Sequence, residues 1–260
     1  MRIATWNVNS VKQRLEHLKR FLGEQQPDMV CLQELKCQEP AFPAEEIEAL
    51  GYTIAVLGQK AFNGVAILSK SPLAEIRRGL PGDDGDEQAR YLEAVVSTHS
   101  GVVRVASIYL PNGNPLGTEK FTYKLAWMER LRRHAAELLK LEEPLVLAGD
   151  YNVIPDPKDV SDPASWAGDA LFQPESRRAY RGLLGLGLTD ALRACDDSPG
   201  LYTFWDYQAG AWQRNKGIRI DHLLLSPQAA DRLVGVDIHK ETRGWEKPSD
   251  HVPVSVVLDI

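Results

Sequence analysis

Residues 102–148 read VVRVASIYLPNGNPLGTEKFTYKLAWMERLRRHAAELLKLEEPLVLA and contain the patterns that decide the fold. Two short apolar runs, Val102–Tyr109 and Leu145–Ala148, have the length and composition of buried strands. Between them, apolar residues recur every three or four positions over Glu119–Lys140, which is the period of one face of a helix. A strand, a helix and a strand in this order predict an α/β protein built from layers of sheet and helix.

The same alternation continues on both sides of this stretch. Ser10 and Gln13 have the spacing of a capping box, which predicts that a helix starts there. Pro155–Gly168 is weakly patterned and predicts a long surface loop. The chain has no linker-like tract and no internal repeat, so we expect a single domain over residues 1–260. Further strands are expected at residues 3–6, 29–32, 52–57, 65–68, 92–97, 223–226 and 252–258.

Composition excludes several classes of protein. The 260 residues are 43% hydrophobic and 25% charged, which rules out a disordered or collagen-like chain. The formal net charge of -6 on its own argues against a nucleic-acid partner, because phosphate binding draws on positive charge. Three cysteines without a C-x-x-C pair predict neither a disulfide framework nor a zinc site, and they favour the cytoplasm. No apolar stretch has the length of a membrane span and no signal sequence is recognisable, so no membrane association is expected.

Polar side chains follow many of the predicted strands at the point where each strand ends. Ligands of α/β proteins usually bind beyond strand ends, so these side chains are candidates for a functional site. They are Asn7, Glu34, Tyr109, Asn112, Asp150 and Asn152, and two further acidic positions provide Asp221, after Ile-Arg-Ile, and Asp250 with His251, just before the last predicted strand. Each has an ordinary structural explanation when taken alone, such as a solvated Glu34 or an Asx-turn at Asp150. Their recurrence at the same topological position indicates a shared site.

The chemistry of this set is limited. Carboxylate and amide oxygens without cysteine ligands suit a hard cation, Mg²⁺ or alternatively Mn²⁺, which typically bridges to a phosphate. The set therefore indicates phosphate-ester hydrolysis, in which a carboxylate positions water and a histidine stabilises developing charge. Asp221 is a candidate to orient that histidine. The motifs of serine hydrolases, P-loop NTPases and zincins are absent.

Eight strings, in order along the whole chain, resemble the exonuclease III family of bacterial AP endonucleases. They are T-W-N-V-N-S at 5–10, L-Q-E-L-K at 32–36, N-G-V-A-I-L-S-K at 63–70, Y-L-P-N at 109–112, G-D-Y-N at 149–152, L-T-D-A-L-R at 188–193, R-I-D-H at 219–222 and P-S-D-H-V-P-V at 248–254. Single strings are shared with deoxyribonuclease I-like relatives, sphingomyelinases and inositol polyphosphate phosphatases. The resemblance implies a four-layer α/β sandwich, in which helices flank two packed, mostly antiparallel sheets.

The resemblance also implies a metal site and a site for the attacking water. Glu34 would be the principal metal ligand, with Asn7 and Asp250 on the metal or its waters. Asp150 would activate or orient the nucleophilic water beside the metal, assisted by Asn152.

The scissile phosphate would be held by a second group of residues. His251, paired with Asp221, would bind and neutralise it. Tyr109 and Asn112 would contact the phosphate or the leaving oxygen. The sequence does not decide which group protonates the leaving oxygen.

Substrate selection would fall to the stretch between Tyr202 and Ile220. Phe204, Trp205, Ile218 and Ile220 match the family's apolar pocket for an abasic deoxyribose or a frayed 3′ nucleotide. The alternative is that the two aromatic residues belong to the core of a strand.

Basic residues near the proposed pocket would bind DNA phosphates. Arg219 is expected to contact substrate, and a basic rim is expected from Arg214, Lys216, Arg219, Arg243 and Lys247. The acid-rich segment 82–87 is expected to be a solvated loop turned away from DNA.

The leading expectation is a DNA repair phosphodiesterase that depends on Mg²⁺ and acts as a monomer on double-stranded DNA. Its activities would be AP endonuclease, 3′-to-5′ exodeoxyribonuclease and 3′-phosphatase or 3′-phosphodiesterase, on abasic sites and on blocked or recessed 3′ ends. The alternative is an inositol-phosphate or phospholipid phosphodiesterase or phosphatase. A third hypothesis is a DNA-binding or scaffold protein without catalytic activity, which the unbroken set of acids disfavours.

Overall fold

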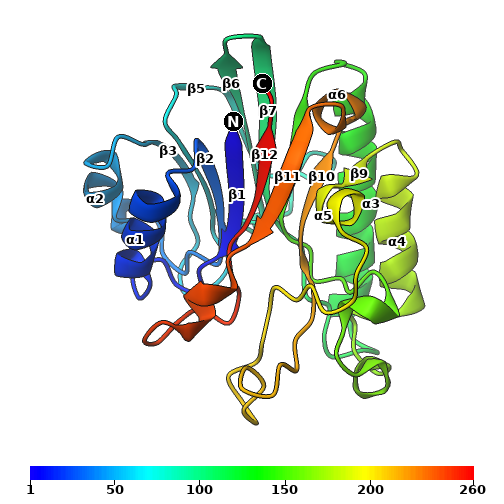
Figure 1. Ribbon diagram of the computed structural model, residues 1–260. Coiled ribbons are helices and arrows are strands. Elements are labelled where there is room, and N and C mark those ends of the chain that lie inside the picture. Colours follow the sequence, from blue (N-terminus) through cyan, green and yellow to red (C-terminus); the bar gives the residue numbers. More distant parts are fainter.

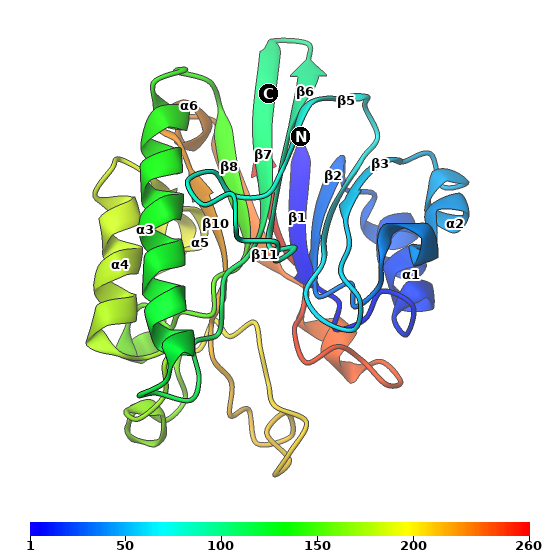
Figure 2. The same ribbon diagram turned by 180° about the vertical axis from the view of Figure 1, so that it is seen from behind.

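The computed structural model describes residues 1–260 as two six-stranded sheets that pack face to face, with helices on both outer faces (Figures 1 and 2). The strands of sheet A are, in spatial order, β11 (Leu233–Ile238), β12 (Val254–Leu258), β1 (Arg2–Asn7), β2 (Met29–Gln33), β4 (Val65–Ser69) and β3 (Thr53–Leu57). The strands of sheet B are β5 (Leu73–Arg78), β6 (Tyr91–Thr98), β7 (Gly101–Tyr109), β8 (Leu145–Asp150), β10 (Asp221–Leu225) and β9 (Thr189–Asp190). The predicted four-layer α/β sandwich is confirmed.

The helices form the two outer layers. Figure 1 shows α1 (Leu15–Gln25) and α2 (Ala44–Glu48) on one side, and α3 (Glu119–Leu139) and α4 (Pro174–Leu184) on the other. The short helices α5 (Ala191–Cys195) and α6 (Pro227–Ala230) lie at the β9–β10 edge of sheet B. No helix combines the length and the apolar character that crossing a membrane would need.

Three apolar clusters hold the layers together. Alternate strand residues point to opposite faces. Ile3, Val105 and Val256 therefore lie in the cluster between the sheets, while Ala4 and Trp6 face the helices outside sheet A. The third cluster joins sheet B to α3 and α4, and its helical half contains Leu131 at the predicted spacing. Because both faces of each sheet are buried, the strands consist of continuous apolar residues rather than alternating apolar and polar ones.

The strand register brings the polar strand ends together. β1 and β2 are parallel, and so are β7 and β8, while the other neighbours are antiparallel. Asp150 on β8 lies opposite Tyr109 on β7 and opposite Asp221 on β10. Asn7 pairs with Gln33 at the corresponding end of sheet A. These ends meet at the lower edge of the sheets in Figure 1.

Glycine is required beside one of these strand ends. A Cβ on Gly149 would lie 2.0 Å from the carbonyl oxygen of Ile108 on the neighbouring strand. Only a residue without a side chain lets β8 approach β7 this closely, one position before Asp150.

Most of the elements expected from the sequence are present, with three kinds of difference. The nine predicted strands are present, and their ends differ from the predicted ends by at most two residues. The predicted loop 155–168 has no helix other than the short 3-10 turns Pro157–Asp159 and Pro163–Trp166. The capping box at Ser10 is wrong, because Ser10 is in a turn with φ +86° and α1 begins at Leu15. The strands β5, β9 and β11, and the helices α2, α4, α5 and α6, were not expected.

Candidate active site

A cavity of about 260 Å³ lies among the strand ends at this edge of the two sheets. Asn7 and Asp221 contact residues of its lining from behind. The sequence analysis missed two polar lining residues, Asn114 and Asp169. The polar lining consists of Glu34, Tyr109, Asn112, Asn114, Asp150, Asn152, Asp169, Asp250 and His251.

Two carboxylates and an imidazole converge in this cavity. One ligand atom from each of Glu34, Asp150 and His251 lies within 4.8 Å of the others. Asn7 Nδ2 donates to Glu34 Oε1 and to Asp150 Oδ2, both at 2.9 Å. Burial raises the pKa of Asp150 to about 7, and the neighbouring carboxylate of Asp221 adds to this effect. Because a hard divalent cation would stabilise both carboxylates in their ionised form, the donor set fits such a cation.

Asp250 also lines the cavity and is linked to Glu34 by two side chains. Asp250 Oδ1 accepts from Asn9 Nδ2 at 3.0 Å, and Asn9 Oδ1 accepts from Lys36 Nζ. Lys36 Nζ lies 3.0 Å from Glu34 Oε2. Burial opposes ionisation of Glu34, but Asn7 and Lys36 outweigh it and lower its pKa. Sequence reasoning gave Asn9 no role and missed Lys36, although each lies two residues after a predicted site residue.

His251 is fixed by Asp221, as the sequence analysis expected. Its Nδ1 lies 2.9 Å from Asp221 Oδ2, which also accepts from Thr203 Oγ1 at 2.6 Å. Its Nε2 lies 3.7 Å from Asp150 Oδ2. Burial lowers the pKa of His251, but the carboxylates of Asp221 and Asp150 outweigh burial and raise this pKa to about 10. The ring is therefore a cation at neutral pH, with one N–H on Asp221 and the other directed toward Asp150.

The two amide side chains on the far side of Asp150 are held by the strand ends. Asn152 N donates to Asp150 Oδ1, and Asn152 Nδ2 donates to the Leu110 carbonyl, both at 2.9 Å. Asn112 Nδ2 donates to Asn152 Oδ1 at 3.2 Å. Glu34 has a positive φ of +52°, which is unfavourable for a residue of this type, whereas asparagine adopts the φ of +48° at Asn152 more readily. Such strain concentrates at functional sites, where the surrounding structure maintains it.

Tyr109 presents a neutral phenol to the cavity. Burial raises its pKa well above the ordinary value, and the carboxylates of Glu34 and Asp150 raise it further. The Arg90 guanidinium lies 4.9 Å from the centre of the phenol ring, on the side of β6. Tyr109 is therefore a hydrogen-bond donor at neutral pH rather than a base.

An apolar wall completes the cavity. Phe204, Ile218 and Ile220 line it, as expected from the sequence. Trp166 and Leu171 also line it, and sequence reasoning missed both because they lie in or next to the weakly patterned loop. Phe204 and Ile218 form an isolated antiparallel bridge, which places their side chains side by side.

Trp205 does not line the cavity. It is fully buried, its ring packs edge-on against Trp212 with centroids 4.9 Å apart, and its Nε1 donates to Asn215 Oδ1. The expectation that it binds substrate is wrong, because it is on the opposite side of the chain from Phe204. The alternative that the two aromatic residues belong to the core is therefore correct for Trp205 and not for Phe204.

Arg219 is also inaccessible to substrate. Its side chain is 1% exposed, and its guanidinium is paired with Asp159 and Asp190. Arg243 is buried as well, and donates to the carbonyl of Trp205. The prediction that Arg219 and Arg243 belong to a basic rim is wrong. Both guanidinium groups are buried and are bound by acceptors inside the protein, so they do not reach the surface. Arg214, Lys216 and Lys247 remain exposed.

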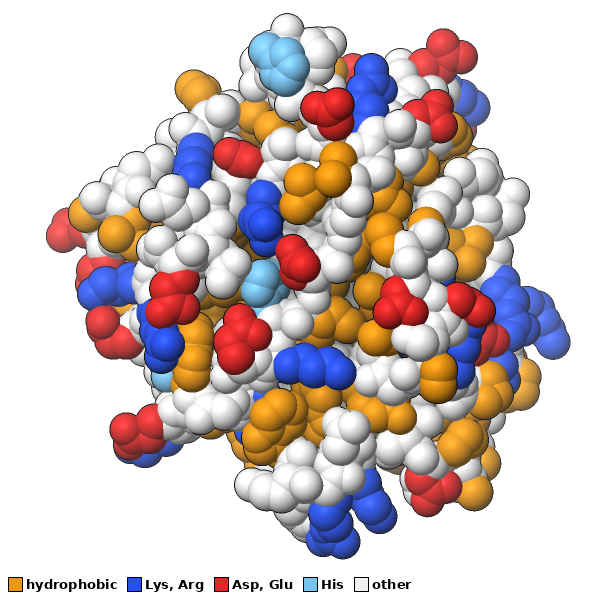
Figure 3. Space-filling model, in the orientation of Figure 1, with side chains coloured by type: hydrophobic (Ala, Val, Ile, Leu, Met, Phe, Trp, Pro, Cys, Tyr) orange, Lys and Arg blue, Asp and Glu red, His pale blue; other side chains and the backbone are white.

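Figure 3 shows basic, acidic and apolar side chains mixed over the face of the molecule, with basic side chains at the lower tip. The loop that carries Arg214 and Lys216 lies at this end in Figure 1. The acid-rich segment 82–87 is only partly solvated, because Asp86 is paired with Arg130 at 2.7 Å and accepts from Tyr123.

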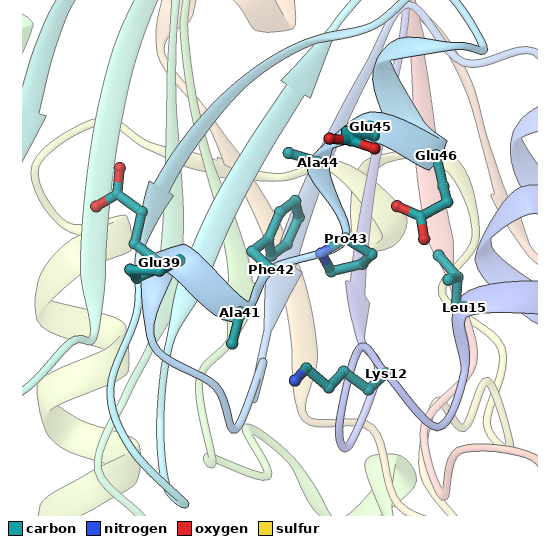
Figure 4. Close-up of a pocket in the computed structure, with 10 residues that line it drawn as sticks. Lys12, Leu15, Glu39, Ala41, Phe42, Pro43, Ala44, Glu45 and Glu46 are labelled. Carbon is teal, nitrogen blue, oxygen red and sulfur yellow. The ribbon is translucent and has the colours of Figure 1, made fainter.

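A second, more open groove of about 550 Å³ lies between the start of α1 and the segment 39–46 (Figure 4). Its floor includes Phe42 and Pro43, and Lys12 extends into it. Figure 4 shows the carboxylates of Glu39, Glu45 and Glu46 pointing in different directions. The convergent titratable groups are therefore those of the cavity at the strand ends.

The two-sheet sandwich and the cluster of carboxylates and histidine in its cavity are features of a hydrolase. The chain belongs to the endonuclease/exonuclease/phosphatase family, whose model matches residues 4–251. It is 34% identical to exodeoxyribonuclease III of Haemophilus influenzae, over 98% of both chains. Two solved structures are similar to this chain over the full length of both proteins compared. A 3′ phosphatase from Neisseria, NExo, bound to a product DNA hairpin is 39% identical with a TM-score of 0.96. An AP endonuclease from Archaeoglobus fulgidus is 36% identical with a TM-score of 0.95.

Proposed function

We propose that this protein is a DNA repair nuclease of the exodeoxyribonuclease III type, which hydrolyses phosphate esters in duplex DNA with the help of a divalent cation. The convergence of Glu34, Asp150 and His251 within 4.8 Å beside an apolar wall carries this proposal. The full-length relatives named above are nucleases or a DNA 3′ phosphatase, and they support it. No observation favours an inositol phosphate or a phospholipid as the substrate.

Mg²⁺ is the ion that we propose for this site, with Mn²⁺ as a substitute. Glu34 and Asp250 would hold it, and Asn7, Asp150 and Asn152 surround the same space. When bound, the ion would polarise a phosphoryl oxygen and stabilise negative charge that develops in the transition state.

The chain's own groups have separate tasks. Asp150, oriented by Asn7 and Asn152, accepts a hydrogen bond from the attacking water and aligns it. His251 donates from Nε2 to an oxygen of the scissile phosphate, while Asp221 keeps the ring charged and oriented. Tyr109 and Asn112 add neutral donors on the other side of the phosphate.

The apolar wall selects the substrate. Phe204, Ile218 and Ile220 present carbon surface where a sugar next to the phosphate would lie. A deoxyribose without a base fits such a surface, whereas a paired base would have to leave its stack first. The proposed substrates are therefore duplexes with abasic sites and duplexes with blocked or recessed 3′ ends.

The remaining proposals concern the form of the enzyme. Residues 1–260 act as one catalytic domain, since both sheets contribute to one cavity. We propose that it acts as a monomer. The three cysteines are free, which supports a reducing compartment such as the cytoplasm.

The decisive experiment compares three end-labelled duplexes, which contain an internal abasic site, a 3′-phosphate or a recessed 3′-hydroxyl. The wild-type protein is expected to cleave them with Mg²⁺, to stop in EDTA and to recover with Mn²⁺. Asp150→Asn is expected to lower the rate by about three orders of magnitude or more, because it removes the group that aligns the water.

Asp237→Asn is the matched control, since Asp237 is more than half exposed and pairs with Arg2. Circular dichroism shows whether each variant is folded. Wild-type protein that cleaves no duplex, or a folded Asp150→Asn protein with near-normal turnover, would remove the proposed function.

A further inference from the structure

Arg219 and two aspartates form a closed ion network directly behind the apolar wall of the cavity. Arg219 Nε and Nη2 donate to the two oxygens of Asp159, at 2.6 and 3.2 Å. Its Nη1 donates to Asp190 Oδ2 at 2.8 Å. The side chains of Arg219, Asp159 and Asp190 are at most 7% exposed. We call these three residues the brace.

The brace is connected to the cavity through its neighbours in the chain. Ile218 and Ile220 line the cavity, and Arg219 between them points the other way, because side chains alternate in extended chain. Arg219 N also donates to the Asp159 carbonyl at 2.8 Å, and Val160 forms a bridge with Ile218. Asp159 is therefore tied to the Ile218–Ile220 wall by both main chain and side chain.

Asp159 also begins a second segment that lines the cavity and packs in the same apolar cluster as Ile218 and Ile220. The chain continues from Asp159 through the 3-10 turn Pro163–Trp166 to Leu171, and Trp166 and Leu171 line the cavity. The Arg219–Asp159 pair thus joins the Ile218–Ile220 segment to the start of this second lining segment. A bidentate pair between a guanidinium and a carboxylate fixes orientation as well as distance.

The Arg219 guanidinium has no spare donor for DNA. His222 Nε2 lies 3.0 Å from the Val153 carbonyl, so it donates, and Nδ1 then accepts from Arg219 Nη1 at 3.0 Å. Arg193 supplies a second guanidinium to Asp159. The buried Arg219 and the half-buried Arg193 thus face two buried carboxylates, and every nitrogen of the Arg219 guanidinium has a partner.

We propose that the brace is a specificity-determining device, which fixes the Ile218–Ile220 segment relative to the 159–171 segment in the cavity lining and so decides whether a sugar without a base can enter. The inference rests on the proposed function and adds to it. An internal abasic site presents a sugar beyond the scissile phosphate, whereas a terminal 3′-phosphate presents only oxygen there. Weakening the brace therefore impairs the first substrate much more than the second.

Steady-state kinetics on these two duplexes test the inference with Arg219→Met and Arg219→Lys. In Arg219→Met, kcat/KM for the abasic duplex is expected to fall at least about tenfold more than kcat/KM for the 3′-phosphate duplex, because the sugar is misplaced. Most of the difference is expected in KM. Arg219→Lys is expected to be intermediate, since lysine keeps the charge but not the bidentate geometry.

Arg104→Met is the matched control. Arg104 on β7 is also buried, at 8% side-chain exposure, and pairs with Glu75, Glu93 and Glu143, toward the end of the strand remote from the cavity. This variant is expected to lose stability while the ratio between the two substrates stays at the wild-type value. An equal loss on both substrates in Arg219→Met would overturn the proposal.

Hydrogen exchange gives a measurement that does not depend on DNA. Amides of residues 155–171 are expected to exchange faster in Arg219→Met and in Asp159→Asn than in the wild type, and not in Arg104→Met. If Arg219→Met does not fold, Arg219→Lys takes its place in both measurements. If the wild-type protein cleaves neither duplex, the proposed function is contradicted but the brace is not. If exchange at 155–171 is unchanged in the variants, the brace proposal is contradicted.

Discussion

Asn7 connects the two carboxylates that the two sheets contribute to the cavity. It lies at the end of β1 in sheet A and donates one hydrogen bond to Glu34, which follows β2, and one to Asp150, at the end of β8 in sheet B. Its Oδ1 accepts from Asn9 N at 3.0 Å, which fixes the orientation of the amide. A single side chain thus sets the distance between the two carboxylates.

Asn7→Ala should weaken the binding of divalent cations by about 10- to 100-fold, because both carboxylates lose the partner that orients them. Isothermal titration with Mn²⁺, without DNA, measures the affinity directly. Gln25→Ala on α1 removes an amide far from the cavity and should leave the affinity unchanged. An Asn7→Ala protein that binds Mn²⁺ as tightly as the wild type would contradict this role.

The sequence predicts the residues of the catalytic cluster because Glu34, Asp150 and His251 stand next to unmistakable apolar runs. It fails between residues 204 and 219, where no regular strand tells which side of the chain faces the cavity. Trp205 and Arg219 were placed in the site for that reason, and both face away from it. Trp166 had no signal, because a weakly patterned loop has no periodicity to interpret.

At the level of elements, the sheets could be predicted where they are buried and not where they are exposed. The buried strands contain continuous apolar residues, as in β4. The edge strand β5 has the sequence LAEIRR and is largely exposed, and the edge strand β11 is only half-buried. Since an exposed edge needs no apolar face, neither strand shows the alternation that predicts a strand.

One ion network joins three elements on the side of sheet B away from the cavity. Glu93 on β6 accepts from Arg104 on β7 at 2.9 Å, lies 2.7 Å from His134 Nε2 on α3, and accepts from Tyr91. Burial opposes ionisation of Glu93, but the hydrogen bonds from these three partners lower its pKa from 4.5 to about 2. The folded state therefore holds this proton less tightly than the unfolded chain does.

The sign of the pH effect follows from this lowered pKa. Stability from Glu93 is present above the unfolded pKa and is lost as the pH falls from about 4.5 toward about 2. Glu93→Gln should destabilise the fold at pH 7 by roughly 3 kcal/mol, with the deficit shrinking below pH 4.5. Urea unfolding at pH 7, 4.5 and 3 measures the deficit, with the exposed Glu24→Gln as control. A deficit that stays constant from pH 7 to pH 3 would contradict this assignment.

On the scale of the whole molecule, the net charge of -6 does not describe the charge near the cavity, because many charged side chains are internal. Several acids lie in buried ion pairs, and others lie in the cavity, where the proposed divalent cation would offset their charge. Two of the five basic residues expected in the rim are also internal. The remaining exposed cations near the site, Arg214, Lys216 and Lys247, are few.

Binding of an abasic duplex by Asp150→Asn protein should therefore depend only modestly on salt, with a slope of log K against log salt of about -3 for three phosphate contacts. Removing Arg214 and Lys216 together should bring the slope closer to zero by about 2, because each contact contributes about 0.9. Fluorescence anisotropy at several salt concentrations measures it. Lys140→Ala, at the end of α3 remote from the cavity, should not change the slope. A steep slope that survives the double substitution would place the phosphate contacts elsewhere.

Sheet A is completed by segments from opposite ends of the sequence, since β1 pairs with both β2 and β12. During synthesis, Glu34 and Asp150 leave the ribosome long before Asp250 and His251. β1 has no β12 partner until then, and pairing over such a sequence separation is slow. The order of synthesis thus leaves the two carboxylates without His251, the cationic side chain of the cavity, until the chain is almost complete.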